Sequence, residues 1–269
     1  MPAIRPSFLK SQISQLLEHF ESPTNFTHEL HGLLDYYADR TRRTTTVSGS
    51  ANFLRQYFIP KPVLSAVEQM LIPGIVGNPK LALALADKLW GEDWVECRII
   101  AIFILGGLPP QPTSIILDRI ERWGSTCKET SITKALASQG LGRLYREEED
   151  TYYQALETWL VTDQHPLLKV GLEAVPTLIA DQYFENLPLL FRWLAPLFRD
   201  GDIELKDQFN DIIRALAVKA PGESTRFLRK ILVSSTNRRA SAAVIRGALD
   251  AFPPAMRAQL EEVIRQPKP

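Results

Sequence analysis

Apolar residues recur at steps of three and four positions along most of this 269-residue chain. The segment "FLKSQISQLLEHF" (8–20) shows the pattern clearly, and "FTHELHGLLDYY" (26–37) repeats it. This spacing covers one face of an amphipathic helix. The sequence lacks the sustained alternation of apolar and polar residues that indicates strands. The polar segment "TTTVSGS" (44–50) predicts a loop, and the chain is predicted to be all-α.

Start signals and prolines divide the predicted helices into pairs. "DWVE" (93–96) and "TCKE" (126–129) both fit the capping box, in which a first side chain caps N–H groups and a glutamate reaches back. Prolines separate many of the apolar runs, as in "LPPQP" (108–112) and "FPP" (252–254). Short helices joined by short turns indicate helix hairpins stacked in series.

One pattern, a helix end, a polar break and a cation early in the next helix, returns with a fixed period. The cations Arg98, Lys134, Lys169, Lys206 and Arg239 follow one another at steps of 36, 35, 37 and 33 residues. A helix-pair period of this length is typical of α-solenoids, whose repeats bury their apolar faces only on their neighbours. We therefore predict a right-handed α-superhelix of HEAT-like repeats over residues 61–269. Residues 1–60 are predicted to form an N-terminal helical cap and a flexible loop.

The recurring cations allow two interpretations. Polar residues that can cap a helix precede several of them, such as Asp93, Asp163, Asp202 and Asn237, so the cations could form a ladder of bonds between repeats. Alternatively, the second helix of each pair lines the concave side and places the cations in a row that suits a phosphate backbone. The candidate DNA-binding residues are Arg98, Lys134, Lys169, Lys206, Arg238 and Arg239.

Charge and cysteine content narrow the class of protein. Basic and acidic residues number 31 each, but residues 211–269 carry 11 basic and 5 acidic side chains, a net charge of +6. A basic end of this kind can serve an anionic partner. Cys97 and Cys127 have neither disulfide nor metal-ligand spacing and are predicted to be buried thiols. Without a secretory signal or a membrane-spanning apolar run, we predict a cytoplasmic monomer that needs no cofactor.

Other candidate sites have structural interpretations. Trp90, Trp123, Trp159 and Trp193 fall near the repeat period, which favours core packing between repeats. His28 and His31 lack further ligands at metal-site spacing and are predicted to lie on the surface. No nucleotide-binding, metallohydrolase or nucleophile motif is present.

From about residue 60 to its end the chain resembles the AlkD-type DNA alkylation repair proteins, which are HEAT-like DNA glycosylases. The resemblance rests on "LALADKLWGEDWVECRIIAI" (83–102), "WLVTDQHPLLKVGLEAV" (159–175) and "IELKDQFNDIIRALAVKAP" (203–221), followed by "NRRAS" (237–241). The order and separation of these segments are the specific part. The resemblance implies a basic concave cleft that holds duplex DNA by its backbone.

The resemblance also implies where catalytic residues would fall. The family's glycosylases use an aspartate, an arginine and two tryptophans to stabilise a departing cationic base. Here the arginine position holds Lys169, the aspartate position holds Lys134, and the tryptophan positions hold Glu129 or Thr130 and Asp211. A lysine in place of the carboxylate would repel the positive charge that develops on the base.

Three functional hypotheses follow. The first is a DNA-binding repeat protein related to alkylation repair, without efficient base excision and with unknown catalytic residues. The second is an adaptor or scaffold that binds a protein in the same groove. The third is an active alkylpurine glycosylase in which Asp207, Asp211 or Glu173 has taken over the catalytic role.

Overall fold

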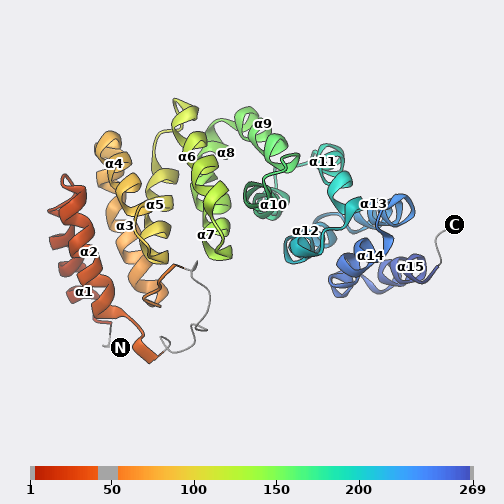
Figure 1. Cartoon of the computed structure of the whole chain (residues 1–269), viewed down its shortest axis with the longest axis horizontal. Coiled ribbons are helices and arrows are strands. Elements are labelled where there is room, and N and C mark those ends of the chain that lie inside the picture. Colours follow the sequence, from red (N-terminus) through yellow and green to blue (C-terminus); the bar gives the residue numbers. More distant parts are fainter. Residues whose placement is uncertain (1–3, 42–53, 267–269) are drawn as a thin grey trace. The chain divides into compact units, whose positions relative to one another are not determined.

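The structure is a computed structural model that describes residues 4–41 and 54–266 (Figure 1). The chain divides into two compact units, Met1–Tyr152 and Tyr153–Pro269. The predicted loop at 44–50 lies outside the described residues. Across residues 4–41 and 54–266, no helix has the length and apolar character needed to cross a membrane.

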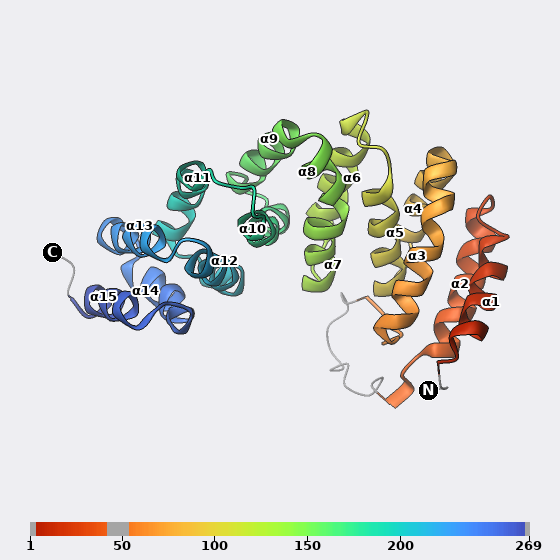
Figure 2. The same ribbon diagram turned by 180° about the vertical axis from the view of Figure 1, so that it is seen from behind.

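The first unit consists of helices that stand side by side in chain order (Figures 1 and 2). Its helices are α1 (Pro6–Leu17), α2 (Pro23–Tyr37), α3 (Lys61–Gly77), α4 (Pro79–Trp90), α5 (Val95–Gly107), α6 (Thr113–Thr126), α7 (Thr130–Ala135), the π-helix η2 (Leu136–Gly140) and α8 (Gly142–Glu147). Helices α1, α3, α5 and α7 pack in succession as one layer, and α2 packs on α4 in the other. Helix α9 (Glu149–Leu160) contains the division between the units.

The second unit repeats the two-layer arrangement. Its helices are α10 (His165–Ala180), α11 (Leu187–Asp200), the 3₁₀ turn η3 (Ile203–Leu205), α12 (Lys206–Lys219), α13 (Pro221–Ser234), α14 (Arg238–Arg246), the 3₁₀ turn η4 (Leu249–Ala251) and α15 (Pro254–Arg265). Helices α10, α12 and α14 pack in succession, and so do α11, α13 and α15. The prediction of an all-α helical repeat protein is confirmed. The boundary predicted at residues 60 and 61 stays a prediction.

Prolines mark helix starts, as the sequence indicated. Pro79, Pro188, Pro221 and Pro254 each lie in the first turn of a helix, where the missing N–H has no helical partner to lose.

The core includes three of the four periodic tryptophans, Trp123, Trp159 and Trp193, which are at most 4% exposed. The prediction that they pack in the core is confirmed, and so is the burial of both cysteines.

Polar bonds between neighbouring helix pairs follow the repeat period. The clearest is Arg119, whose guanidinium donates to both carboxylate oxygens of Asp87 at 2.9 and 2.6 Å. Bonds of the same kind join residues 35 to 38 positions apart: Gln208 to Glu173, Arg143 to the carbonyl of Gly107, Arg214 to Asp250, His165 to Asp202 and Lys219 to the carbonyl of Asp181. A ladder between repeats therefore exists, but most of its donors are not the recurring cations that the sequence suggested.

Helix α5 approaches η2 so closely that only a glycine fits at the contact. A Cβ atom on Gly106 would lie 2.0 Å from the backbone oxygen of Gln139. A π-helical turn at this contact lets α7 continue into η2 while its backbone bulges toward α5. The two helices therefore approach each other backbone to backbone at this point.

We expect Gly106→Ala to lower the free energy of unfolding by about 2 kcal/mol, because the added methyl group overpacks a backbone contact that cannot yield easily. Gly32 is the matched control, since it lies within α2 and a Cβ there would meet nothing within 4 Å. Gly32→Ala should raise the free energy of unfolding by about 0.5–1 kcal/mol through lower chain entropy in the unfolded state. Chemical denaturation of both variants tests the pair, and equal stabilities would contradict the close packing of α5 on η2.

Candidate nucleic-acid interface

A short extended segment, residues 54–58, crosses the start of α5, and we call it the strap. Arg55 and Trp94 form an isolated parallel bridge. The N–H of Arg55 donates to the carbonyl of Asp93 at 2.9 Å, and the N–H of Val95 donates to the carbonyl of Arg55 at 2.9 Å. The strap thus brings a chain segment that precedes α3 against the connection between α4 and α5.

Two glutamates near the starts of successive helices fasten the strap. Glu96, which is 3% exposed, accepts hydrogen bonds from the N–H groups of Tyr57 and Phe58 at 3.0 and 2.8 Å. Glu129 accepts one from the N–H of Leu54 at 3.0 Å. Burial raises the pKa of Glu96, and the N–H groups of the strap oppose that rise by stabilising the carboxylate.

These contacts correct the capping-box prediction at both places. Helix α5 has Trp94 at its N-cap, and α7 has Glu129, and neither residue makes a side-chain capping bond. Both boxes failed for the same reason: each glutamate binds the backbone of a segment far away in the sequence.

The backbone of the strap bends at Phe58, whose φ is 56°. A non-glycine residue in this left-handed region costs roughly 1–2 kcal/mol. The bend places two successive N–H groups on one carboxylate, so the bonds to Glu96 offset that cost.

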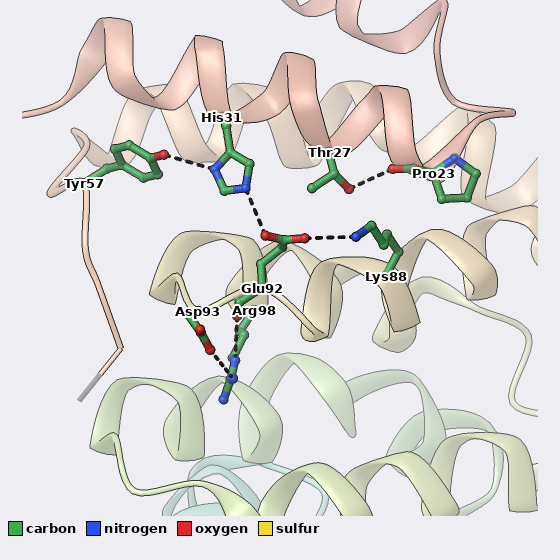
Figure 3. Close-up of polar contacts among 8 residues, drawn as sticks. All are labelled: Pro23, Thr27, His31, Tyr57, Lys88, Glu92, Asp93 and Arg98. Carbon is green, nitrogen blue, oxygen red and sulfur yellow. Dashed lines mark hydrogen bonds and ion pairs between the residues drawn. The ribbon is translucent and has the colours of Figure 1, made fainter. Parts of the chain in front are cut away.

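A second polar network joins α2 to the end of α4 (Figure 3). His31 Nδ1 lies 3.0 Å from the hydroxyl of Tyr57, and its Nε2 lies 3.3 Å from Oε2 of Glu92. Lys88 donates to the other oxygen of Glu92 at 3.2 Å. Burial alone would raise the pKa of Glu92, but the hydrogen bonds from Lys88 and His31 outweigh it and lower that pKa. His31, which was predicted to lie on the surface, is half-buried and links three segments.

Arg98 holds the connection between α4 and α5 together. Its Nε donates to the carbonyl of Glu92 at 3.1 Å, and its guanidinium lies 3.8 Å from the carboxylate of Asp93 (Figure 3). The same guanidinium lies over the ring of Trp90 at 4.8 Å, and that ring stacks on Trp123 at 4.5 Å. With its side chain only 16% exposed, Arg98 is committed to contacts within the protein.

The second unit presents three cations on three helices that pack in succession. Lys169 lies in the second turn of α10, Lys206 opens α12, and Arg239 lies in the first turn of α14. Arg239 is exposed and the two lysines are partly exposed. Lys206 and Arg239 have no ion pair or side-chain hydrogen bond with any residue in the described ranges. Asp202 lies 2.9 Å from Nε2 of His165. That hydrogen bond is the main cause that lowers the pKa of Asp202, and the positive charge of Lys169 lowers it further.

Arg238, the neighbour of Arg239, has a different environment. Its guanidinium donates to the carbonyl oxygens of Leu232 and Val263, both at 2.5 Å, and of Gln266 at 3.0 Å. These carbonyls lie at the ends of α13 and α15, where helices leave oxygen atoms without an N–H partner and favour positive charge. Arg238 therefore joins two helix ends. The predicted N-cap of this helix is confirmed, since Asn237 accepts from the N–H of Ala240.

The other DNA-binding and catalytic candidates from the sequence differ in their exposure and contacts. Lys134 is exposed on α7. Glu173 is 8% exposed and accepts a hydrogen bond from Gln208 at 3.0 Å, so it links α10 to α12. Asp207 is exposed and Asp211 is half-buried, both on α12. Within the described residues, no cluster of histidine, cysteine and carboxylate side chains could hold a metal ion.

A family model described as DNA alkylation repair enzyme matches residues 50–252, which is well over half of the chain. The chain belongs to this family. Neither the curated proteins nor the solved structures include a match. The assignment confirms the resemblance found in the sequence. The match begins earlier than the resemblance did, so that it includes the strap, and it ends at residue 252, before α15. It covers helices of both units, including the three that carry Lys169, Lys206 and Arg239.

The adjacent arginines of α14 can be compared directly, because Arg238 binds other parts of this DNA alkylation repair family member whereas Arg239 is exposed. We expect Arg238→Ala to lower the free energy of unfolding by about 2 kcal/mol, because helix-end carbonyls lose a charged donor. Arg239→Ala should leave stability unchanged within about 0.5 kcal/mol, as is usual for exposed sites. Thermal and chemical denaturation measure both values. Equal destabilisation of the two variants would show that Arg238 does not join the helix ends.

Proposed function

We propose that this chain holds duplex DNA by its phosphate backbone through Lys169, Lys206 and Arg239, which we call the cation row. The observation that carries the proposal is that three helices in direct succession each present a cation near their N-terminus. Membership of the DNA alkylation repair family relates the chain to DNA repair and makes DNA the expected anionic partner.

The position of the cation row on its helices strengthens the argument. A cation at a helix N-terminus gains nothing from the helix dipole, which favours anions there. Backbone N–H groups at the same end can themselves bind a phosphate group. Packed helices lie roughly 8–10 Å apart, so neighbouring members of the row can meet different phosphates of one backbone. Contacts of this kind hold DNA without reading its sequence.

The other cations predicted from the sequence divide into two groups. Arg98 and Arg238 use their guanidinium groups within the protein, so we give them no part in DNA binding. Lys134 is exposed in the first unit, and we keep it as a further phosphate contact that acts independently of the cation row.

Reversal of the row should abolish most of the affinity for DNA. For Lys169→Glu/Lys206→Glu/Arg239→Glu we expect binding to a short duplex to weaken at least a hundredfold at low salt. The slope of log affinity against log salt should flatten by about 0.9 for each phosphate group that the variant no longer neutralises. Fluorescence anisotropy across a salt series, repeated with two unrelated duplex sequences, measures both effects.

The matched control reverses three exposed arginines in the layer of α11, α13 and α15. Arg226→Glu/Arg229→Glu/Arg257→Glu changes the net charge by the same amount as reversal of the row. Its affinity for DNA should stay within about threefold of the unmodified protein, because only long-range electrostatics change. Equal weakening in the two triple variants, or no salt-sensitive binding by the unmodified protein, would refute the cation row and favour the scaffold hypothesis.

We also propose that the chain lacks efficient base excision. The position that carries the carboxylate in the family's glycosylases holds Lys134, and a carboxylate is what stabilises the charge on a departing base. Of the three possible replacements, Glu173 is buried and already bonded to Gln208. A glycosylase with relocated acids therefore has to rely on Asp207 or Asp211.

Little or no 3-methyladenine or 7-methylguanine should be released from methylated DNA by the unmodified protein. If slow release is detected, Lys134→Asp should increase it, because a carboxylate then faces the developing charge. Chromatography of released bases under single-turnover conditions measures the rates. Release as fast as that of a competent alkylpurine glycosylase would refute this part of the proposal.

A further inference from the structure

Helices α11 and α13 pack side by side in the second unit, and a hollow of about 370 Å³ opens between them. We call it the α11–α13 groove. Its floor is aromatic, since the rings of Phe191 and Phe227 stack with centroids 4.5 Å apart and planes 13° apart. The buried ring of Phe198 packs against Phe227 in a T-shaped arrangement, with the ring centroids 5.9 Å apart. A rigid apolar hollow of this size can accept one large apolar side chain.

Basic side chains surround the hollow. Arg192, Arg199 and Lys230 line it, and no acidic residue appears among the lining residues of the described chain. The side chain of Arg192 is 68% exposed and its ion pair with Glu157, at 3.4 Å, is between two exposed groups. Such a pair is weak and leaves the arginine able to meet another anion.

Pro196 lies inside α11 and also lines the groove. Its ring adds to the apolar surface of the hollow. The groove therefore combines an apolar floor with a basic rim.

We propose that the α11–α13 groove binds a short acidic segment of a partner protein, with one large apolar side chain of that segment in the hollow. The rim recognises the carboxylates, and the floor takes the apolar side chain. A DNA backbone can satisfy only the rim, since it has no apolar group that protrudes into a hollow of this kind.

The groove is separate from the cation row. It lies in the layer formed by α11 and α13, whereas the row lies in the layer formed by α10, α12 and α14. Three basic residues and no acidic residue of the described chain line the groove, so it is electrostatically complementary to an acidic chain without help from the row. Peptide binding at the groove thus does not depend on the proposed DNA binding.

The test uses a fluorescein-labelled peptide in which a run of glutamates is followed by Trp-Phe, and a control peptide that ends in Ala-Ala. The first peptide should bind at least about tenfold more tightly than the control, which measures the contribution of the apolar floor. Arg192→Glu/Lys230→Glu should weaken binding at least about tenfold through the rim. Ala195→Trp, which fills the groove and leaves the charge unchanged, should weaken it to the same extent.

Two comparisons make the result decisive. Arg226→Glu/Arg229→Glu, on α13 but outside the residues that line the groove, should bind the peptide within about threefold of the unmodified protein. Circular dichroism melting of every variant confirms that it is folded. The proposal is overturned if both peptides bind equally, if Ala195→Trp binds as well as the unmodified protein, or if the groove variants weaken the binding of duplex DNA instead.

Discussion

Within each unit, a helix pair buries its apolar face against the pair before it and the pair after it. That constraint sets the spacing of the polar bonds as well as that of the core. Arg119 to Asp87, Gln208 to Glu173 and Arg214 to Asp250 all join residues separated by about one repeat, so they fix the register of one pair on the next. Charged groups that these bonds hold in buried positions, such as Arg119 with a side chain 18% exposed, are occupied within the protein, whereas cations that stay largely exposed can act on a partner.

The first two residues of helix α14 are one charged group of each kind. Arg238 and Arg239 are neighbours in the sequence, but successive residues point about 100° apart around a helix, so they face different surroundings. The guanidinium of Arg238 is surrounded by helix-end carbonyls, whereas Arg239 is exposed. Their chemistry is identical, and only the position of the ends of α13 and α15 beside Arg238 decides which of them can meet a phosphate group.

The fold could be predicted from the sequence because its signals are local. Apolar spacing, prolines in the first turn and the cap at Asn237 all act within a few residues, and the repeat period reports how those units stack. The strap and the polar network around His31 could not be predicted, since Leu54 and Glu129 are 75 residues apart and His31 and Glu92 are 61 apart. A glutamate that starts a helix looks the same in the sequence whether it caps that helix or binds a distant backbone. The period could not separate Arg98, whose guanidinium is held within the protein, from Lys169, Lys206 and Arg239, because regular spacing shows that a residue recurs without showing which face it occupies.

The two proposed surfaces of the second unit are both basic, and charge alone does not separate their partners. The two surfaces differ in the groups that lie next to the charged side chains. The cation row belongs to helix N-termini, where N–H groups and side chains offer donors to an anion that has no apolar part. The α11–α13 groove sets its cations around stacked phenylalanines, and an anion without an apolar group would leave that floor in water. The two proposals therefore assign a phosphate backbone to the first surface and an acidic peptide with an apolar side chain to the second, and they differ in the surface chemistry that each partner requires.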